Sequence, residues 1–320
     1  MSVTLEVHHR QVVRLHRTAL RTLAALGATA LVVLGGLRLW AATARDEAAC
    51  AAGDWQGCED RLFNGQGTPS GLLRLALEYA SLGLLFLPVL IGAFVAGPMI
   101  ARELESGTYR LAWTQSAAPS RWLTSRLVVP VAAAAAGAVA VSAVFRFAVA
   151  PLRESYAFGW HVRGVYEVLG PVLAAQCALA VCVGAVMGLL VRRTVAAMAV
   201  TGAATGLILL VTGAARWHLW PTVTTTSGDT SRAGVTPAPH DALVRDTGFL
   251  TENGRLPLSG CWERTGGGTP CTGDGIIGRY AVHHPSAHFW PLQLVETGIL
   301  LAVAALAALA AYRLLARRHA

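Results

Sequence analysis

The segment LEYASLGLLFLPVLIGAFVAGPMI, residues 77–100, contains a single charged residue, Glu78. An apolar helix of about 20 residues is long enough to cross the hydrocarbon core of a bilayer. Apolar residues make up 54% of the chain and charged residues only 14%, which leaves too little polar surface for a soluble protein. The chain is therefore predicted to be an all-α integral membrane protein.

Five more segments of this kind occur along the sequence. The predicted transmembrane helices are residues 22–40, 77–100, 127–149, 168–191, 194–214 and 292–315. Together they define one six-span membrane domain over residues 22–315, followed by a short tail at 316–320. The fourth and fifth spans are separated only by Arg192 and Arg193, which indicates a tight turn at one face of the membrane.

The arginines predict on which side of the membrane each connection lies. Arginine-rich short segments stay in the cytoplasm, and here they are the amino terminus, residues 101–126, the turn at 192–193 and the carboxyl-terminal tail. We therefore expect a multi-pass protein of the cell membrane with both termini in the cytoplasm. Residues 41–76 and 215–291 form the main extracellular loops. The net charge of +8 then favours contact with anionic lipids rather than with nucleic acid, because the arginines flank apolar spans.

The amino terminus has a helical pattern of its own. Arg10, Arg14, Arg17 and Arg21 recur at steps of four, three and four, and apolar residues occupy the opposite stripe. This spacing predicts that residues 1–21 form a cytoplasmic amphipathic helix that lies on the membrane surface.

The predicted extracellular loops contain four cysteines: Cys50, Cys58, Cys261 and Cys271. In an oxidising compartment they are candidates for two local disulfides, although cross-pairing between the loops remains open. The last two cysteines have histidines nearby in sequence, but their spacing matches no tight zinc pattern, so we predict no metal site. Residues 221–242, rich in Thr, Ser, Gly and Pro, are expected to be a flexible connector to a small external cap.

Three carboxylates fall in the first turns of helices that begin outside: Glu78, Glu167 and Glu296. The positive end of the helix dipole stabilises carboxylates there, which favours a structural role. A charged residue inside a membrane is also a candidate for a transport pathway. Glu78 and Glu296 are the best candidates for that role.

Residues 101–127, ARELESGTYRLAWTQSAAPSRWLTSRL, interrupt the apolar pattern between the second and third spans. The second span is expected to continue into the cytoplasm until Gly107 ends it. Thr108 can then cap a short transverse helix that ends before Pro119, and Ser120 can cap the third span. Such an amphipathic element is suited to docking into a groove on a soluble partner.

At this point the sequence resembles a family. Residues 101–123 look like the first cytoplasmic loop of actinobacterial permeases of the type-2 ATP-binding-cassette exporter class. The matching residues are Glu103, Glu105, Gly107, Thr108, Arg110, Leu111, Trp113, Thr114, Gln115 and Arg121. A second likeness lies at HHPSAHFWPLQLVETGIL, which is similar to the start of the last span in these permeases, with His288 where a basic residue, often arginine, is usual.

The resemblance implies a permease subunit that pairs with a second copy or a sister permease above two ATPase subunits. It assigns the coupling to the ATPase to Glu103, Glu105, Gly107, Thr108, Arg110, Leu111, Trp113 and Arg121. The sequence has no lysine, and a Walker A loop needs one, so ATP and Mg²⁺ are expected on the partner and this chain is not itself expected to be an enzyme. A non-transporting membrane scaffold or sensor is the alternative, since it would share the same topology.

Overall fold

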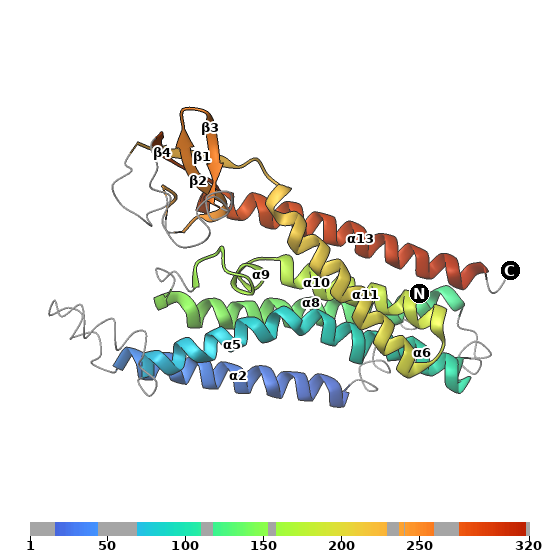
Figure 1. Cartoon of the computed structure of the whole chain (residues 1–320). Helices are drawn as coiled ribbons and strands as arrows, with labels where there is room; N and C mark the ends of the chain where they lie inside the picture. Colours follow the sequence, from blue (N-terminus) through green and yellow to red (C-terminus); the bar gives the residue numbers. More distant parts are fainter. Residues whose placement is uncertain are drawn as a thin grey trace.

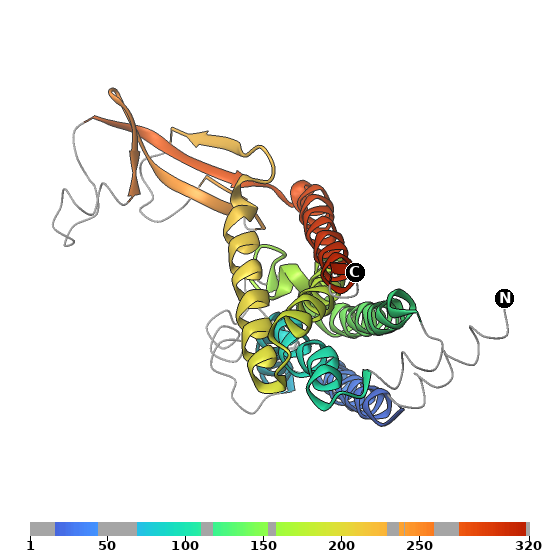
Figure 2. The ribbon, with the colours of Figure 1, turned by 90° about the vertical axis from the view of Figure 1, so that its right-hand side faces the viewer.

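The computed structural model describes residues 17–43, 69–109, 118–152, 158–228, 237–239, 241–258 and 275–317. Long helices run side by side along one axis, and a small β-sheet sits at one end of them (Figure 1). We call this end the sheet end. The opposite end, where α6 (Gly97–Ser106) stops at Gly107, is the Gly107 end. Seen along the helices, the sheet projects to one side of the bundle and α11 (Thr194–Ala215) is strongly tilted (Figure 2).

The remaining helices follow in chain order, with η marking 3₁₀ or π segments. They are α2 (Arg17–Thr43), α5 (Pro69–Leu90), η1 (Ile91–Ala96), α8 (Pro119–Val149), η2 (Ala150–Leu152), α9 (Val165–Leu169), α10 (Val172–Val191), η4 (Arg216–His218), η5 (Ser286–His288) and α13 (Phe289–Arg317).

Five helical segments in the described part of the chain are long and apolar enough to cross a membrane. They are Gly71–Ser106, Pro119–Val149, Val172–Val191, Thr194–His218 and Ser286–Arg317. They correspond to the second to sixth predicted spans. The predicted first span lies in α2, where the apolar stretch Gly27–Ala41 is shorter than the other five.

The helices differ from the predicted elements at two places. The third helix begins at Pro119, and its amino-terminal cap is Ala118 rather than the predicted Ser120, because Pro119 sits in the first turn, where a helix does not use the missing N–H. The fourth predicted span is broken in two: α9 ends at Leu169 and α10 begins at Val172. Gly170 between them is extended, since a residue that precedes proline disfavours the helical conformation.

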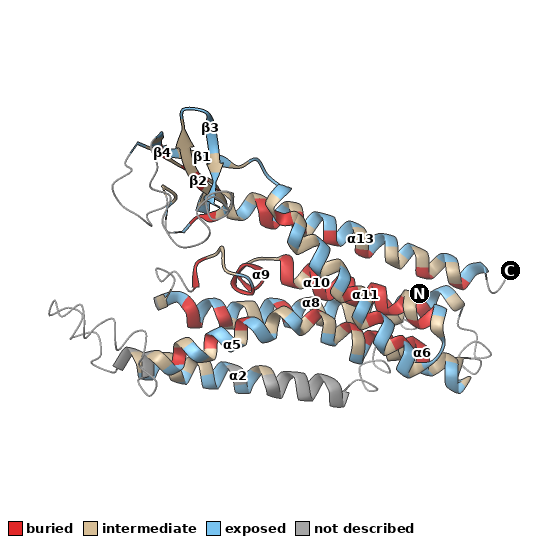
Figure 3. Cartoon of the chain, in the orientation of Figure 1, coloured by how far each residue is buried: buried red, intermediate tan, exposed pale blue. Residues whose placement is uncertain are grey.

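Helix α10 lies at the centre of the bundle and packs against α6, α8, α11 and α13. Its apolar residues surround the whole helix rather than one face, a pattern that is typical of a buried helix. The buried residues gather along α10 and along the sides of its neighbours that face it (Figure 3). The core therefore surrounds α10, and the outer faces of the other helices carry the exposed apolar side chains.

Glycines let the second span lie against α10 at backbone distance. A Cβ atom placed on Gly184 would lie 2.4 Å from the Cβ of Ala96, and one on Gly188 would lie 3.1 Å from the Cβ of Ile100. The second span is a π-helix at this contact, where the N–H of Gly97 bonds to the carbonyl of Gly92, five residues back. Small residues of this kind allow close helix packing inside a membrane.

The connection between α11 and α13 differs most from the predicted all-α fold. It forms an antiparallel sheet of β1 (Val223–Ser227), β2 (Leu243–Thr251), β3 (Gly254–Pro257) and β4 (Ile276–His284), in the order β1-β4-β2-β3. Strand β1 falls inside the predicted flexible connector, which is therefore wrong at these residues. Its threonines and valine are β-branched and pair well in a strand, although we had expected only loop from their polarity.

We predict that Gly184→Ala lowers the melting temperature of the detergent-solubilised protein, because overpacking a tight core contact costs about 1–3 kcal/mol. The matched control is Gly137→Ala on α8, where an added Cβ meets no atom within 4 Å. We expect Gly137→Ala to have the melting temperature of the wild type and Gly184→Ala to melt several degrees lower. Equal melting of the two variants would show that the backbones do not approach closely at Gly184.

Candidate functional site

The predicted coupling segment starts where α6 ends. Gly107 has φ of 73°, the left-handed conformation in which glycine commonly ends a helix. The Thr108 hydroxyl lies 3.5 Å from the carbonyl oxygen of Glu103 and 3.0 Å from the Ser106 hydroxyl. Thr108 therefore contacts the carboxyl end of α6. The short helix that it is predicted to cap lies outside the described residues, so that role stays a prediction.

Glu103 joins α6 to the first turns of α8. Its Oε2 accepts a hydrogen bond of 3.0 Å from the indole N–H of Trp122, and its Oε1 forms an ion pair with Arg126. Trp122 is buried, so the carboxylate and the indole form one contact between the two helices. Further along the same turn, the hydroxyls of Thr124 and Tyr312 lie 2.7 Å apart and link α8 to the end of α13.

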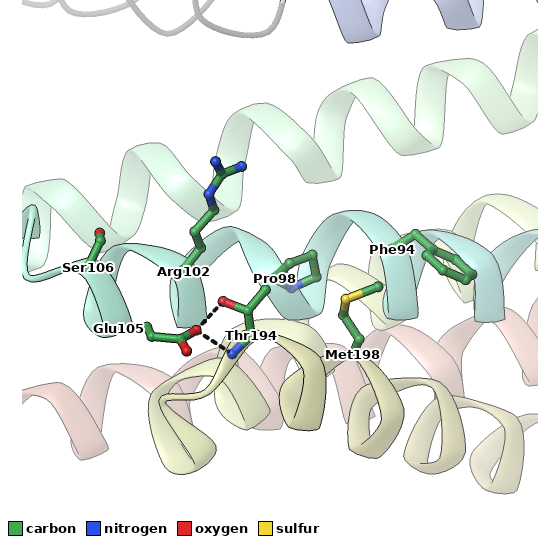
Figure 4. Close-up of a pocket in the computed structure, with 7 residues that line it drawn as sticks. All are labelled: Phe94, Pro98, Arg102, Glu105, Ser106, Thr194 and Met198. Carbon is green, nitrogen blue, oxygen red and sulfur yellow. Dashed lines mark hydrogen bonds between the residues drawn. The ribbon is translucent and has the colours of Figure 1, made fainter.

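Glu105 joins α6 to α11 instead. Its Oε2 accepts two hydrogen bonds from Thr194, one from the backbone N–H at 2.8 Å and one from the hydroxyl at 2.5 Å (Figure 4). Thr194 is the first residue of α11, so this carboxylate satisfies an N–H that has no partner within the helix and lies at the positive end of the helix dipole. The two glutamates of one turn thus hold two different helices.

The structure describes five of the eight predicted coupling residues. Glu103, Glu105, Gly107 and Thr108 lie together at the end of α6, and Arg121 is exposed on the first turn of α8. Arg110, Leu111 and Trp113 lie outside the described residues, as does the predicted transverse helix. The contacts to Trp122, Arg126 and Thr194 were not predicted from the sequence. The sequence signal for the Glu103 contacts is the pair Trp122 and Arg126, which lie four residues apart on the next helix and therefore on the same face of it.

A second cluster lies near the sheet end, where one guanidinium is held by two carboxylates. The Nη2 of Arg216 lies 2.8 Å from Glu167, and its Nε lies 2.9 Å from Glu296. Exposed fractions of 7%, 2% and 1% for Arg216, Glu167 and Glu296 show that all three are buried. The guanidinium also stacks 3.8 Å from the centre of the Tyr166 ring. We call these four residues the Arg216 cluster.

The Arg216 cluster ties three elements together, because its residues come from α9, η4 and α13. Gln293 of α13 strengthens the link: its side-chain amide donates to the Tyr166 carbonyl at 2.7 Å and accepts from the Val172 N–H at 3.3 Å. A Cβ atom on Gly170 would lie 2.1 Å from the Gln293 side-chain oxygen, so a glycine is required beside it. These contacts fix α13 against the α9–α10 corner.

The predicted pathway residues, Glu78 and Glu296, are not brought together. Glu78 is exposed on α5, whereas Glu296 is buried in the Arg216 cluster. Sequence reasoning missed Arg216, since it lies just beyond the predicted end of the fifth span. The signal that could have found it is the lone arginine there, at the same membrane depth as Glu167 and Glu296 at the starts of two other spans.

Several other predicted sites lie wholly or partly outside the residues that the structure describes. Cys50, Cys58, Cys261 and Cys271 are among the residues not described, and so are Arg10 and Arg14; Arg17 and Arg21 lie in α2. Within the described ranges, no three His, Cys, Asp or Glu side chains gather as a metal site. Instead the Nδ1 atoms of His284 and His288 lie 3.2 Å apart, so that this contact joins β4 to η5, and burial lowers the pKa of His284.

We predict that Arg216→Gln is the most destabilising substitution in the Arg216 cluster, because it leaves two buried carboxylates with no cation. Loss of one partner of a buried ion pair costs about 3–5 kcal/mol. Glu167→Gln should be milder, since Arg216 keeps both of its bonds to Glu296. Exposed Glu78→Gln is the control, and melting temperatures in detergent measure the order. An order in which Glu167→Gln melts below Arg216→Gln would contradict the charge balance proposed for the cluster.

Comparison with known proteins identifies the family of the chain. The family model described as "ABC-2 membrane transporter related" matches residues 21–216, which is more than half of the chain. The match includes Glu103, Glu105, Glu167 and Arg216. No curated protein and no solved structure matches the chain. On the family model, this chain belongs to the ABC-2 membrane transporter related family.

Proposed function

We propose that this chain is the membrane-spanning permease subunit of an ATP-driven exporter, in which a separate ATPase subunit docks at the Gly107 end. Family membership supports a transporter permease. The observation that carries the rest is the pair of glutamates at the end of α6, each of which fastens that helix to a different neighbour. We infer that α2 also crosses the membrane as the first span, which brings the number of spans to six, and that both termini are cytoplasmic.

The contacts at the Gly107 end suggest how force from an ATPase is distributed. A push on the segment after Gly107 is transmitted to α8 through Glu103 and to α11 through Glu105. The Thr124–Tyr312 contact extends the connection to α13. Since these helices converge on α10, we expect them to tilt as a group rather than one at a time, which is a known kind of switching motion.

The energy for this motion is assigned to the partner. Within the printed sequence there is no lysine, so the chain contains no Walker A loop of the usual type, and we place ATP and Mg²⁺ on the ATPase. The proposed transporter contains a second copy of this chain or a sister permease, and its path lies between the two permease units. In this scheme the chain contributes the path and the coupling contacts but no catalytic group.

The Arg216 cluster resists this motion at the sheet end. It holds α9, η4 and α13 together where the proposed path opens to the outside. We therefore assign Glu296 to holding this end closed in the resting permease, rather than to contact with the transported molecule.

We predict that a neighbouring reading frame encodes an ATPase with Walker A and B motifs, that this ATPase co-purifies with the chain, and that two variants separate docking from transmission. Trp113→Ala should reduce co-purification, since the side chain belongs to the proposed docking segment. Glu105→Gln should leave co-purification intact but reduce the permease-stimulated rate of ATP hydrolysis about twofold to thirtyfold, as expected for the loss of a coupling contact. Exposed Glu252→Gln near the sheet is the control. An unchanged rate in Glu105→Gln, or no bound ATPase in the wild type, would refute this coupling.

We also predict that the Gly107 end faces the cytosol. A cysteine introduced at Ser116 should react with a membrane-impermeant maleimide only after cells are permeabilised. A cysteine introduced at Asn253, in the turn between β2 and β3, should react in intact cells. Labelling is measured above the background of the wild-type chain. Reaction of the Ser116 cysteine in intact cells would remove the basis for an ATPase at this end.

A further inference from the structure

We propose that the groove between α6 and α11 is a binding site for an anionic phospholipid, with the headgroup at the Gly107 end and the acyl chains alongside Phe94 and Met198. This proposal does not need an ATPase partner, but it rests on the inference under Proposed function that the Gly107 end lies at the cytoplasmic face.

The groove has a polar half and an apolar half. Its volume is about 530 Å³, within the range of small-molecule sites, and it is open on one side. The lining residues are Phe94, Pro98, Arg102, Glu105, Ser106, Thr194 and Met198 (Figure 4). Phe94, Pro98 and Met198 lie on the side toward the middle of the helices, and the polar residues lie toward their ends at Gly107. An amphiphile that lies along the helices matches this division.

The polar half is positively charged. Arg102 lines the groove, and Arg192 and Arg193 directly precede the lining residue Thr194 in the chain. All three are exposed, and within the described residues none of them forms an ion pair. Glu105 is the single acidic residue that lines the groove, and its Oε2 is occupied by the two bonds from Thr194. Counted together, the two charged lining residues Arg102 and Glu105 and the two arginines next to Thr194 give a charge of +2 at this end of the groove. Basic pockets between transmembrane helices at the cytoplasmic face bind anionic lipid headgroups.

The floor of the groove is formed in advance of any ligand. Gly97 allows α6 to approach α11 so closely that an added Cβ would lie 3.0 Å from the carbonyl oxygen of Ala197. The Glu105–Thr194 bonds then hold the two helices at the polar end. A site that needs no rearrangement loses less free energy on binding.

The surroundings favour a lipid as the source of the anionic group. Phe94 is 63% exposed and Val195 is 77% exposed. The open side of the groove is therefore part of the exposed apolar surface of the bundle, which lipid acyl chains cover in a membrane. A free phosphate would use only the arginines, and a purely apolar molecule would use only Phe94 and Met198. A phospholipid with a negative headgroup uses both halves.

The test measures binding of a fluorescent phosphatidylglycerol to the full-length protein in neutral detergent. We expect Arg102→Gln and Arg193→Gln each to weaken binding about fivefold, the effect of removing one basic side chain near an anionic headgroup. Met198→Trp, which narrows the apolar half but keeps every arginine, should also weaken binding. Arg313→Gln, exposed near the end of α13, is the control and should bind like the wild type. A fluorescent phosphatidylcholine should bind weakly to all of them.

Three results would overturn the proposal. If Arg313→Gln weakens binding as much as Arg102→Gln, the attraction is to the whole charged surface rather than to the groove. If Met198→Trp binds like the wild type, the acyl chains do not lie in the groove. If inorganic phosphate at millimolar concentration displaces the lipid, the arginines bind a soluble anion instead. Unchanged melting temperatures in neutral detergent verify that the variants are folded.

Discussion

The close approach of the second span to α10 and α11 is the constraint on which the rest of the structure depends. Glycines at positions 97, 184 and 188 remove the side chains that would otherwise keep these backbones apart. Inside a bilayer there is little hydrophobic force between helices, so van der Waals contact of this kind has to supply the attraction. At this close approach the side chain of Glu105 on α6 reaches the first residue of α11.

The two ends of the bundle are held by different chemistry. At the Gly107 end, carboxylates of α6 contact an indole, a guanidinium and a helix amino terminus, and several of these groups are accessible to water. At the sheet end, the charges are buried and depend on one another. Contacts exposed to water exchange partners at little cost, whereas a buried ionic cluster opens only with a large penalty. A motion that starts at the Gly107 end therefore meets its main resistance at the opposite end.

The sequence allowed the class of fold and most of the helices to be predicted, since length and apolar content alone identify a span. It did not reveal the sheet, because β1 has the polar composition of a loop and the strands pair across distant residues: β1 pairs with β4, and β4 with β2. The charges at the sheet end were assigned individually to helix dipoles. Glu167 and Glu296 share Arg216 because of the way α9, η4 and α13 pack together. The hydrophobic periodicity of the sequence does not predict that packing. The family resemblance identifies Glu103 and Glu105, but only the structure shows which residues they contact within the chain.

The Arg216 cluster also bears on the absence of lysine from the sequence. A guanidinium is flat and presents its N–H groups in a fork, so one arginine can bond Glu296 through two nitrogens, reach Glu167 and still lie face to face with the Tyr166 ring. An ammonium group concentrates its charge at one point and cannot occupy all of these positions at once. Substitution of arginine by lysine is harmless at an exposed position such as Arg313. At position 216 it would leave a buried carboxylate without its hydrogen-bond partner inside the membrane.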